Sequence, residues 1–215
     1  MERRVVLKNL GLAFGYVVAA PTLISIVQGC KNENGVVWTP EFFTSEEGNV
    51  LRKLVDVILP KTDSPSASEV NVHLFIDKYI NVASTSEQKD LFKLKMSKFI
   101  ALAKTNAGKD ISKELNVEEL EATLASCLKK SSDADTEANR IAMQSYNKSI
   151  ADGDEADLDV KSGAAAFAKE VRGWVIHGYK SSEEIAKNFL AFDPIPGKFV
   201  PCGTITELTG GKAWA

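Results

Sequence analysis

The sequence predicts an all-α protein: a single helical-bundle domain of about six or seven helices, with an N-terminal signal before it and an extended arm after it. Three observations support this fold class. Apolar residues recur every three or four positions in successive segments, as in helices with one buried face. Polar residues at helix-capping spacing precede several of these segments. No stretch alternates apolar and polar residues over a length that predicts a strand.

The first predicted helix lies within "TPEFFTSEEGNVLRKLVDVILP", residues 39–60. Thr44 and Glu47 have capping-box spacing, so we expect the helix to begin after Thr44. Its apolar stripe runs from Val50 to Ile58, and Pro60 ends it because proline has no N–H to continue a helix. The following "KTDSPSAS" is rich in residues that favour turns.

The same reasoning predicts six further helices. Two of them follow capping pairs, Asn116 with Glu119 and Ser181 with Glu184. Each of the six carries an apolar stripe at helical spacing. The stripes lie, in order, in residues 72–80, 86–104, 120–128, 138–146, 162–179 and 181–190.

The N-terminus "MERRVVLKNLGLAFGYVVAAPTLISIVQGC" has the layout of an export signal, a positive head followed by an uncharged stretch at residues 9–28. Arg3 and Arg4, with Leu7 and Lys8 after them, resemble a twin-arginine signal, the address of proteins exported already folded. The stretch is only mildly apolar for a membrane span.

"VQGC" resembles a lipoprotein cleavage box, which predicts that the chain is cut before Cys30 and that Cys30 is lipidated. The alternative is an ordinary signal anchor with an incidental cysteine. The predicted organisation is therefore a twin-arginine-type lipoprotein signal (1–29), a linker (30–41), a helical domain (42–190) and an extended arm (191–215).

The arm "FDPIPGKFVPCGTITELTGGKAWA" holds three prolines and four glycines and shows no helical period. It is too apolar for a disordered tail, so we expect it to lie either on its own bundle or on a partner. The candidate docking residues are its large apolar residues and its turn: Phe192, Pro194, Pro196, Gly197, Phe199 and Trp214.

The charge balance argues against nucleic acid as a partner. The signal carries a net charge of +2, so residues 30–215 carry −5, whereas phosphate binding needs clustered Lys and Arg. Lys89, Lys93, Lys95 and Lys98 do cluster, but on a predicted helix, where a solvated face explains them.

The chain contains no self-contained active site, so we expect no catalytic residue, no bound cofactor and no metal. Nucleotide-binding motifs and CxxC pairs are absent. His73 and Asp77 are four residues apart, which favours a surface hydrogen bond over a ligand pair. The acidic residues at 152–159 complement the start of the next helix rather than form a calcium loop.

Two cysteines, Cys127 and Cys202, remain after lipidation, too few for an iron–sulfur cluster held by this chain. In an oxidising compartment they can form a disulfide that ties the arm to the fourth helix. The alternative is two unpaired thiols, with Cys127 on an apolar stripe.

Two stretches resemble the gluconate 2-dehydrogenase subunit 3 family. The first, "FFTSEEGNVLRKLVDVILPKTDSPSASEVNVHLFIDKYI", has a helix ending at Ile-x-Pro, a Thr-Asp turn and a V-x-x-FID string. The second, "GYKSSEEIAKNFLAFDPIPGKFVPCG", has the Pro-x-Pro-Gly turn at Pro194, Pro196 and Gly197. The middle of the domain carries no recognisable motif, and Ser66 stands where the family's turn has glycine.

The resemblance implies a non-catalytic small subunit without a cofactor of its own. Its partner would be a large flavoprotein of the glucose-methanol-choline type, which holds FAD and oxidises a sugar, sugar acid or polyol. The small subunit would help the partner mature and carry it through twin-arginine export. Lipidation of Cys30 would tether the pair to the membrane on the periplasmic side, and electrons would pass to a cytochrome or quinone.

Two other classes of function remain open. One is a free-standing periplasmic lipoprotein that binds a small ligand in its bundle, in a pocket lined by Tyr79, Tyr146 and Trp174. The other is an enzyme built on the acidic residues at 152–159, which would bind a metal.

Overall fold

A computed structural model describes residues 38–129, 132–191, 197, 200 and 202–214. The chain divides into two units, Met1–Thr39 and Pro40–Ala215, and every helix below belongs to the second. Arg3, Arg4, Leu7, Lys8 and Cys30, the predicted signal and lipidation residues, lie outside the described residues.

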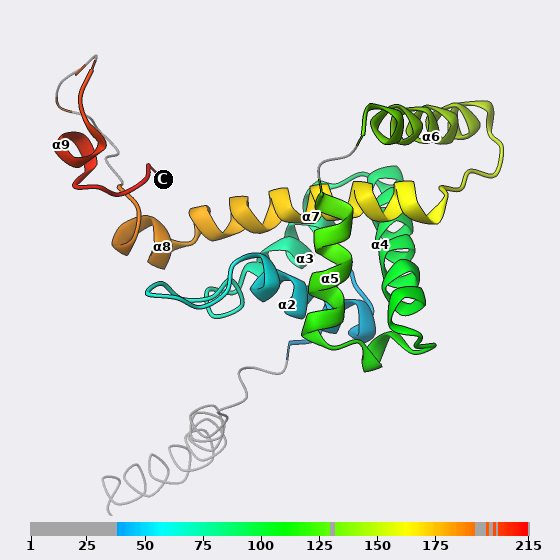
Figure 1. The fold of residues 1–215 in the computed structure, drawn as a ribbon, viewed down its shortest axis with the longest axis horizontal. Helices are drawn as coiled ribbons and strands as arrows, with labels where there is room; N and C mark the ends of the chain where they lie inside the picture. Colours follow the sequence, from blue (N-terminus) through cyan, green and yellow to red (C-terminus); the bar gives the residue numbers. More distant parts are fainter. Residues whose placement is uncertain (1–37, 130–131, 192–196, 198–199, 201, 215) are drawn as a thin grey trace, which may run out of the picture. The chain divides into compact units, whose positions relative to one another are not determined.

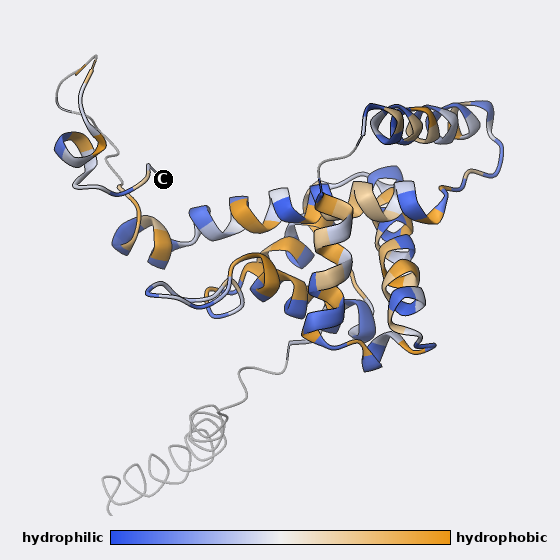
Figure 2. Ribbon diagram, in the orientation of Figure 1, coloured by the Kyte–Doolittle hydropathy of each residue, from blue (hydrophilic) through white to orange (hydrophobic). Residues whose placement is uncertain are grey.

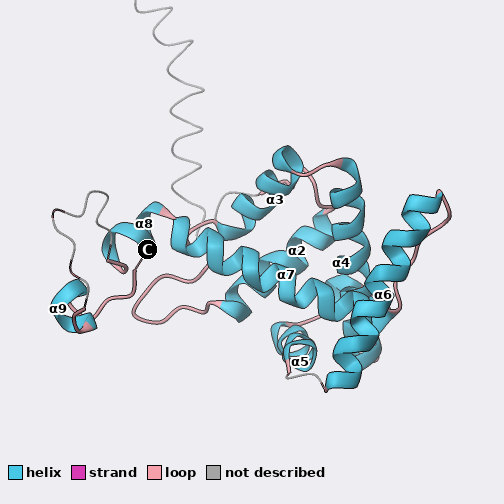
Figure 3. Ribbon diagram, turned by 90° about the horizontal axis from the view of Figure 1, so that it is seen from above, coloured by secondary structure: helices cyan, strands magenta, loops and turns pink. Residues whose placement is uncertain are grey.

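Every regular element of the described residues is a helix, so the predicted all-α class is confirmed (Figures 1 and 3). The seven predicted helices are all present. In order the helices are α2 (Ser45–Ile58), α3 (Val72–Ala83), α4 (Ser86–Ala107), the 3₁₀ helix η1 (Ser112–Glu114), α5 (Val117–Leu128), α6 (Asp133–Asp152), α7 (Val160–Ser181), α8 (Glu183–Asn188) and α9 (Ile205–Thr209).

Two of the predicted helix starts are confirmed by their capping boxes. The Oγ1 of Thr44 accepts the N–H of Glu47 (3.2 Å), and the Glu47 carboxylate accepts the N–H of Thr44 (2.8 Å). Asn116 and Glu119 form the same reciprocal pair at the start of α5. Each box satisfies two backbone groups that a helix N-terminus otherwise leaves without a partner.

The predicted cap of the last bundle helix, Ser181 with Glu184, is wrong. Helix α7 runs through Ser181, whose hydroxyl donates to the carbonyl of His177 (2.8 Å). Ser182 then precedes α8, and its hydroxyl donates to the carbonyl of Tyr179 (2.7 Å). Both hydroxyls therefore close the end of α7 instead of capping the start of α8.

Helix α7 is central to the bundle. Its most extensive contacts are with α4, and it also contacts α2, α3, α5, α6 and α8. The ring of Phe167 on α7 lies 5.6 Å from that of Phe92 and 5.2 Å from that of Phe99, both on α4. Burial of each ring stabilises the fold by roughly 1.5–3 kcal/mol. Figure 2 shows apolar and polar residues alternating along α7, as expected for a helix with one buried face.

The lysine cluster on α4 was predicted to be a solvated face, but two of its lysines form ion pairs with other parts of the bundle. Lys95 pairs with Glu170 of α7 (2.8 Å) and Lys98 pairs with Asp157 just before α7 (2.8 Å). The Lys95 and Lys98 side chains are 13% and 18% exposed, because their stems pack between the helices. The approach is close at Gly163, where a Cβ atom would lie 2.7 Å from the Cγ of Lys98.

Helix α6 is the most exposed of the long helices. Tyr146 is its one buried residue, whereas Ile141 and Ile150 are about half exposed. Its N-terminus is closed by a capping box between Ser132 and Asp135. The exposed side chains of α6 therefore provide a reference surface for substitutions on other faces of the bundle.

The C-terminal arm was predicted to be extended, but part of it is helical. It contains the short helix α9, which starts at a capping box between Thr204 and Glu207. The ends of the arm are joined, because the N–H of Ala191 donates to the carbonyl of Ala213 (2.8 Å) and Ala191 bridges in parallel to Trp214.

Candidate docking surface

Helices α3 and α7 pack together through a glycine. Phe75 on α3 covers Gly178 on α7, where a Cβ atom would lie 2.7 Å from the Cδ1 of the ring and 3.3 Å from the Cγ1 of Val72. The two helices approach this closely because residue 178 has no side chain. The contact fixes the position of α3 on the bundle.

The inner side of α3 binds the segment that precedes α2. Asp77 is 2% exposed, and its carboxylate accepts the N–H groups of Glu41 (2.8 Å), Phe42 (3.0 Å) and Phe43 (3.2 Å). Asp77 is the acidic residue of the FID string, and its role here is structural. The predicted surface position for His73 and Asp77 is wrong, since His73 is only 5% exposed.

Burial of His73 is accompanied by a change in its acidity. Desolvation, followed by the positive charge of Arg52, lowers the pKa of His73 from 6.5 to about 4. The imidazole is therefore neutral at physiological pH. Asp56 and Asp77 act in the opposite direction but do not offset the burial.

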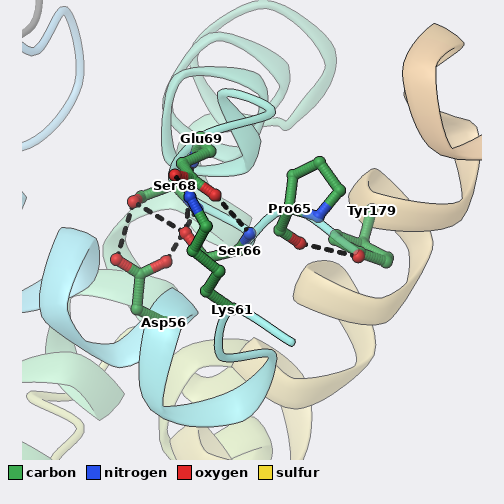
Figure 4. Close-up of polar contacts among 7 residues, drawn as sticks. All are labelled: Asp56, Lys61, Pro65, Ser66, Ser68, Glu69 and Tyr179. Carbon is green, nitrogen blue, oxygen red and sulfur yellow. Dashed lines mark hydrogen bonds and ion pairs between the residues drawn. The ribbon is translucent and has the colours of Figure 1, made fainter. Parts of the chain in front are cut away.

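The turn between α2 and α3 is anchored at both of its sides (Figure 4). On one side, Asp56 accepts both the N–H (2.8 Å) and the hydroxyl (2.6 Å) of Ser68. On the other, the Tyr179 hydroxyl of α7 lies 2.8 Å from the carbonyl oxygen of Pro65 and 2.8 Å from the Oγ of Ser64. Tyr179 thus connects the second family-like stretch to the first.

Ser66 does not need the conformational freedom of glycine in this turn. Its N–H donates to Glu69 (2.8 Å), which also pairs with Lys61 (2.6 Å) (Figure 4). Asn71, which precedes α3, is the one non-glycine residue with positive φ (61°) in the described part of the chain. Asparagine adopts this left-handed conformation more readily than most residues.

An apolar groove of about 580 Å³ runs along the outer side of α3. Lys78 is the one charged residue among the described residues that line it. Exposure is high for apolar side chains here, with Val82 at 74% and Tyr79 at 41%. The groove is lined by Val70, Asn71, Leu74, Phe75, Lys78, Tyr79, Val82 and Ala83, and by Gly178, Ser181 and Ser182 at the end of α7.

An aromatic cluster borders the groove. The ring of Tyr79 lies 4.7 Å from that of Trp174 and 5.7 Å from that of Phe75, and His177 lies 5.9 Å from Phe75. Ile176 next to His177 is 41% exposed. Clustered, partly exposed aromatic residues are typical of protein-binding surfaces.

Sequence reasoning missed this groove, although α3 carries a usable signal. Its sequence "VHLFIDKYINVA" has apolar residues over more than half of the circumference of the helix, and Asp77 outside this apolar side is buried as well, so one buried face does not account for all of them. We refer to the groove and the bordering aromatic cluster together as the α3 surface.

The structure describes only part of the predicted arm site. Phe192, Pro194, Pro196 and Phe199 lie outside the described residues. Gly197 is exposed and Trp214 is 52% exposed. The other large apolar residues described in the arm are also uncovered: Val200 at 42%, Ile205 at 67% and Leu208 at 41%.

The ligand pocket expected from Tyr79, Tyr146 and Trp174 does not form as a single cavity. Tyr79 and Trp174 line a cavity of about 230 Å³ with Glu170 and Gln88, but Tyr146 is not part of its lining. A different cavity, of about 690 Å³, is bordered by α4, α5, α6 and α7. Its walls include Asn106, Cys127 and Lys161.

The two cysteines of the helical domain and arm are both free thiols. Cys127 is buried on α5, and burial raises its pKa, whereas Cys202 is exposed. The structure therefore does not contain the disulfide that sequence reasoning left open, and pairing in an oxidising compartment stays a prediction.

The acidic stretch before α7 has structural roles. Asp159 caps α7 by accepting the N–H of Ser162 (3.0 Å), and Asp157 pairs with Lys98. Within the described ranges, no group of three His, Cys, Asp or Glu side chains is placed to hold a metal ion. Over the same ranges, no helix has the length and hydropathy of a membrane span.

Comparison with known proteins identifies a family. The family model described as gluconate 2-dehydrogenase subunit 3 matches residues 45–197. No curated protein and no solved structure gives a significant match. The matched range includes α3, the turn before it and the end of α7, so it contains the whole groove.

Proposed function

Because the chain belongs to the gluconate 2-dehydrogenase subunit 3 family, we propose that it is the non-catalytic small subunit of a periplasmic FAD-dependent dehydrogenase. The partner is a large flavoprotein of the glucose-methanol-choline type that oxidises a sugar, sugar acid or polyol. The family match carries this proposal, since the family is named for an accessory subunit of a dehydrogenase.

The uncovered apolar residues support a subunit that works in a complex. The α3 surface and the arm each carry apolar side chains that are more than two-fifths exposed, among them Val82, Ile205 and Trp214. Exposed apolar patches commonly mark protein-binding sites. Stable complexes bury roughly 1,200 Å² or more in total, which two separate patches supply more readily than one.

The N-terminal sequence supports a role in export. A flavoprotein must fold around FAD where FAD is made, so it has to cross the membrane in the folded state. A partner without a signal of its own can cross bound to a subunit with a twin-arginine signal, here Arg3 and Arg4. Lipidation at Cys30 then tethers the complex to the membrane. Electrons leave the flavin for a cytochrome or a quinone.

The test is to isolate the affinity-tagged chain from its native cells. We expect a second, larger polypeptide in the eluate, a flavin absorbance spectrum, and sugar or polyol oxidation that depends on this second polypeptide. A chain lacking residues 192–215 is expected to lose the flavoprotein while keeping its helical circular-dichroism spectrum. A single colourless polypeptide from native cells would contradict the proposal.

Export is tested separately. Replacing Arg3 and Arg4 by lysine is expected to leave the flavoprotein in the cytoplasm, although the flavoprotein itself is unchanged. Replacing Cys30 by serine is expected to release the complex from the membrane without stopping export. Normal delivery of the flavoprotein in the Arg3→Lys/Arg4→Lys strain would refute the export role.

A further inference from the structure

We propose that the α3 groove binds an amphipathic helix of the dehydrogenase subunit, with an acidic residue of that helix opposite Lys78. This inference rests on the proposed function, because it names the part of the partner that the small subunit recognises.

The shape of the groove fits a helix. Leu74, Lys78 and Val82 follow one another at intervals of one turn on the outer side of α3. Gly178, Ser181 and Ser182 form the opposite wall at the end of α7. A 12-residue helix such as α3 is about 18 Å long, so a partner helix of about three turns spans the same length.

The chemistry of the groove specifies one apolar face on that helix. Its lining is mostly apolar, and Val82 is 74% exposed at the end of α3. Helices that bind in apolar grooves use side chains at positions i, i+3 or i+4, and i+7. The short side chains of Ser181 and Ser182 on the α7 wall leave room for larger side chains from the partner.

Lys78 adds a requirement for charge. It lies one turn from Leu74 and one turn from Val82, in the middle of the stripe. Lys78 is exposed, and no ion pair joins it to another of the described residues. A covered ammonium group needs an opposite charge, so the helix that covers Lys78 has to supply a carboxylate.

The same lysine argues against a second copy of this chain in the groove. In a symmetric dimer, each surface contacts the identical surface of the other subunit. Antiparallel pairing of two α3 helices about the middle of the stripe would place Lys78 against the Lys78 of the second copy. Like charges in direct opposition are destabilising, so a partner with acidic residues is favoured.

The experiment uses the tagged full chain isolated from native cells with its flavoprotein. A zero-length carbodiimide reagent joins lysine to carboxylate, and mass spectrometry identifies the linked peptides. We expect Lys78 to be linked to an Asp or Glu within a helix of the flavoprotein. In addition, Lys78→Glu, in the middle of the stripe, is expected to weaken retention of the flavoprotein roughly tenfold or more, as for a central interface residue. Val82→Gln, at the end of α3, is expected to weaken retention as well.

Helix α6 provides matched controls. Ile141→Gln removes a β-branched apolar side chain that is 50% exposed, and Lys148→Glu reverses an exposed lysine. Neither is expected to change retention of the flavoprotein. Glutamine is a good helix former, so neither Gln variant should unfold its helix, and unfolding curves for all four variants verify this.

The outcomes separate the two proposals. If the unmodified chain captures the flavoprotein and the groove variants behave like the α6 controls, the groove inference is wrong and the proposed function stands. A crosslink from Lys78 to the arm of the same chain, or to a second copy, also overturns the inference. If the unmodified chain captures no flavoprotein, the proposed function fails, and the inference fails with it.

Discussion

The replacement Asp77→Asn tests whether the FID aspartate holds the segment before α2. The substitution keeps the size of the side chain and removes its charge. One oxygen remains to accept the N–H groups of Phe42 and Phe43, but the new amide nitrogen faces the N–H of Glu41, since Oδ2 is the atom that Glu41 contacts. Two donors then oppose each other.

The expected loss of stability follows from these three bonds. A hydrogen bond to a charged group contributes about 2 kcal/mol, so the lost bond to Glu41 costs that amount. The other two bonds weaken when their acceptor becomes neutral, which adds about 1 kcal/mol. The sum is about 3 kcal/mol, or a fall in the melting temperature of about 6–12 °C for a domain of this size.

The assay is urea unfolding followed by circular dichroism, together with amide hydrogen exchange. We expect a lower midpoint with an unchanged slope, and faster exchange at residues 41–43. The control Asp110→Asn changes an exposed residue after α4 and should stay within about 0.5 kcal/mol of the unmodified protein. An Asp77→Asn protein as stable as this control would refute the structural role of the carboxylate.

Three other predictions concern the same helices. His73 has a pKa lowered from 6.5 to about 4, so between these pH values the unfolded chain binds a proton that the folded chain does not. The free energy of unfolding therefore falls by about 3 kcal/mol as the pH drops from 6.5 to about 4, and a His73→Gln protein should lack this slope in pH-dependent urea unfolding. Tyr179→Phe removes the hydroxyl that holds the turn at Pro65, so we expect a loss of about 1 kcal/mol in urea unfolding and faster amide exchange in residues 59–71. Gly178→Ala places a Cβ atom 2.7 Å from Phe75, which should cost roughly 1–3 kcal/mol of stability in thermal unfolding. The control Gly173→Ala on the same helix meets nothing within 4 Å and should stabilise the protein by up to about 1 kcal/mol. Equal effects of the two alanines would contradict the close packing of α3 on α7.

The elements that sequence reasoning predicted are those specified by local chemistry. Thr44 with Glu47 and Asn116 with Glu119 need only neighbouring residues to form a cap, and both boxes form. The predicted cap at Ser181 does not form because its hydroxyl donates to the carbonyl of His177 instead, a partner that is also local but belongs to the preceding helix. Helix α9 was missed because its five residues are too few to show a helical period.

The candidate site could not be predicted to the same extent, because it depends on contacts between distant residues. The spacing of His73 and Asp77 is compatible with a surface pair, and only the position of residues 41–43 over α3 shows that Asp77 is buried. The groove likewise needs the end of α7 beside α3, about 100 residues later in the chain. The excess of apolar residues on α3 indicated an additional covered face but not what forms it.

Helix α3 combines two roles on opposite sides, and this makes them separable by experiment. Its inner side holds Asp77 against the segment before α2, and its N-terminal half is fixed by the anchored turn and by the contact of Val72 and Phe75 with Gly178. Lys78, the next residue, points toward the groove instead. A change at Asp77 should therefore lower the free energy of unfolding, and it should affect retention of the partner only as a result of this loss of stability. A change at Lys78 should weaken retention of the partner and leave the stability unchanged. A rigid inner side also keeps the outer side ordered before binding, which lowers the entropy lost when a partner helix docks.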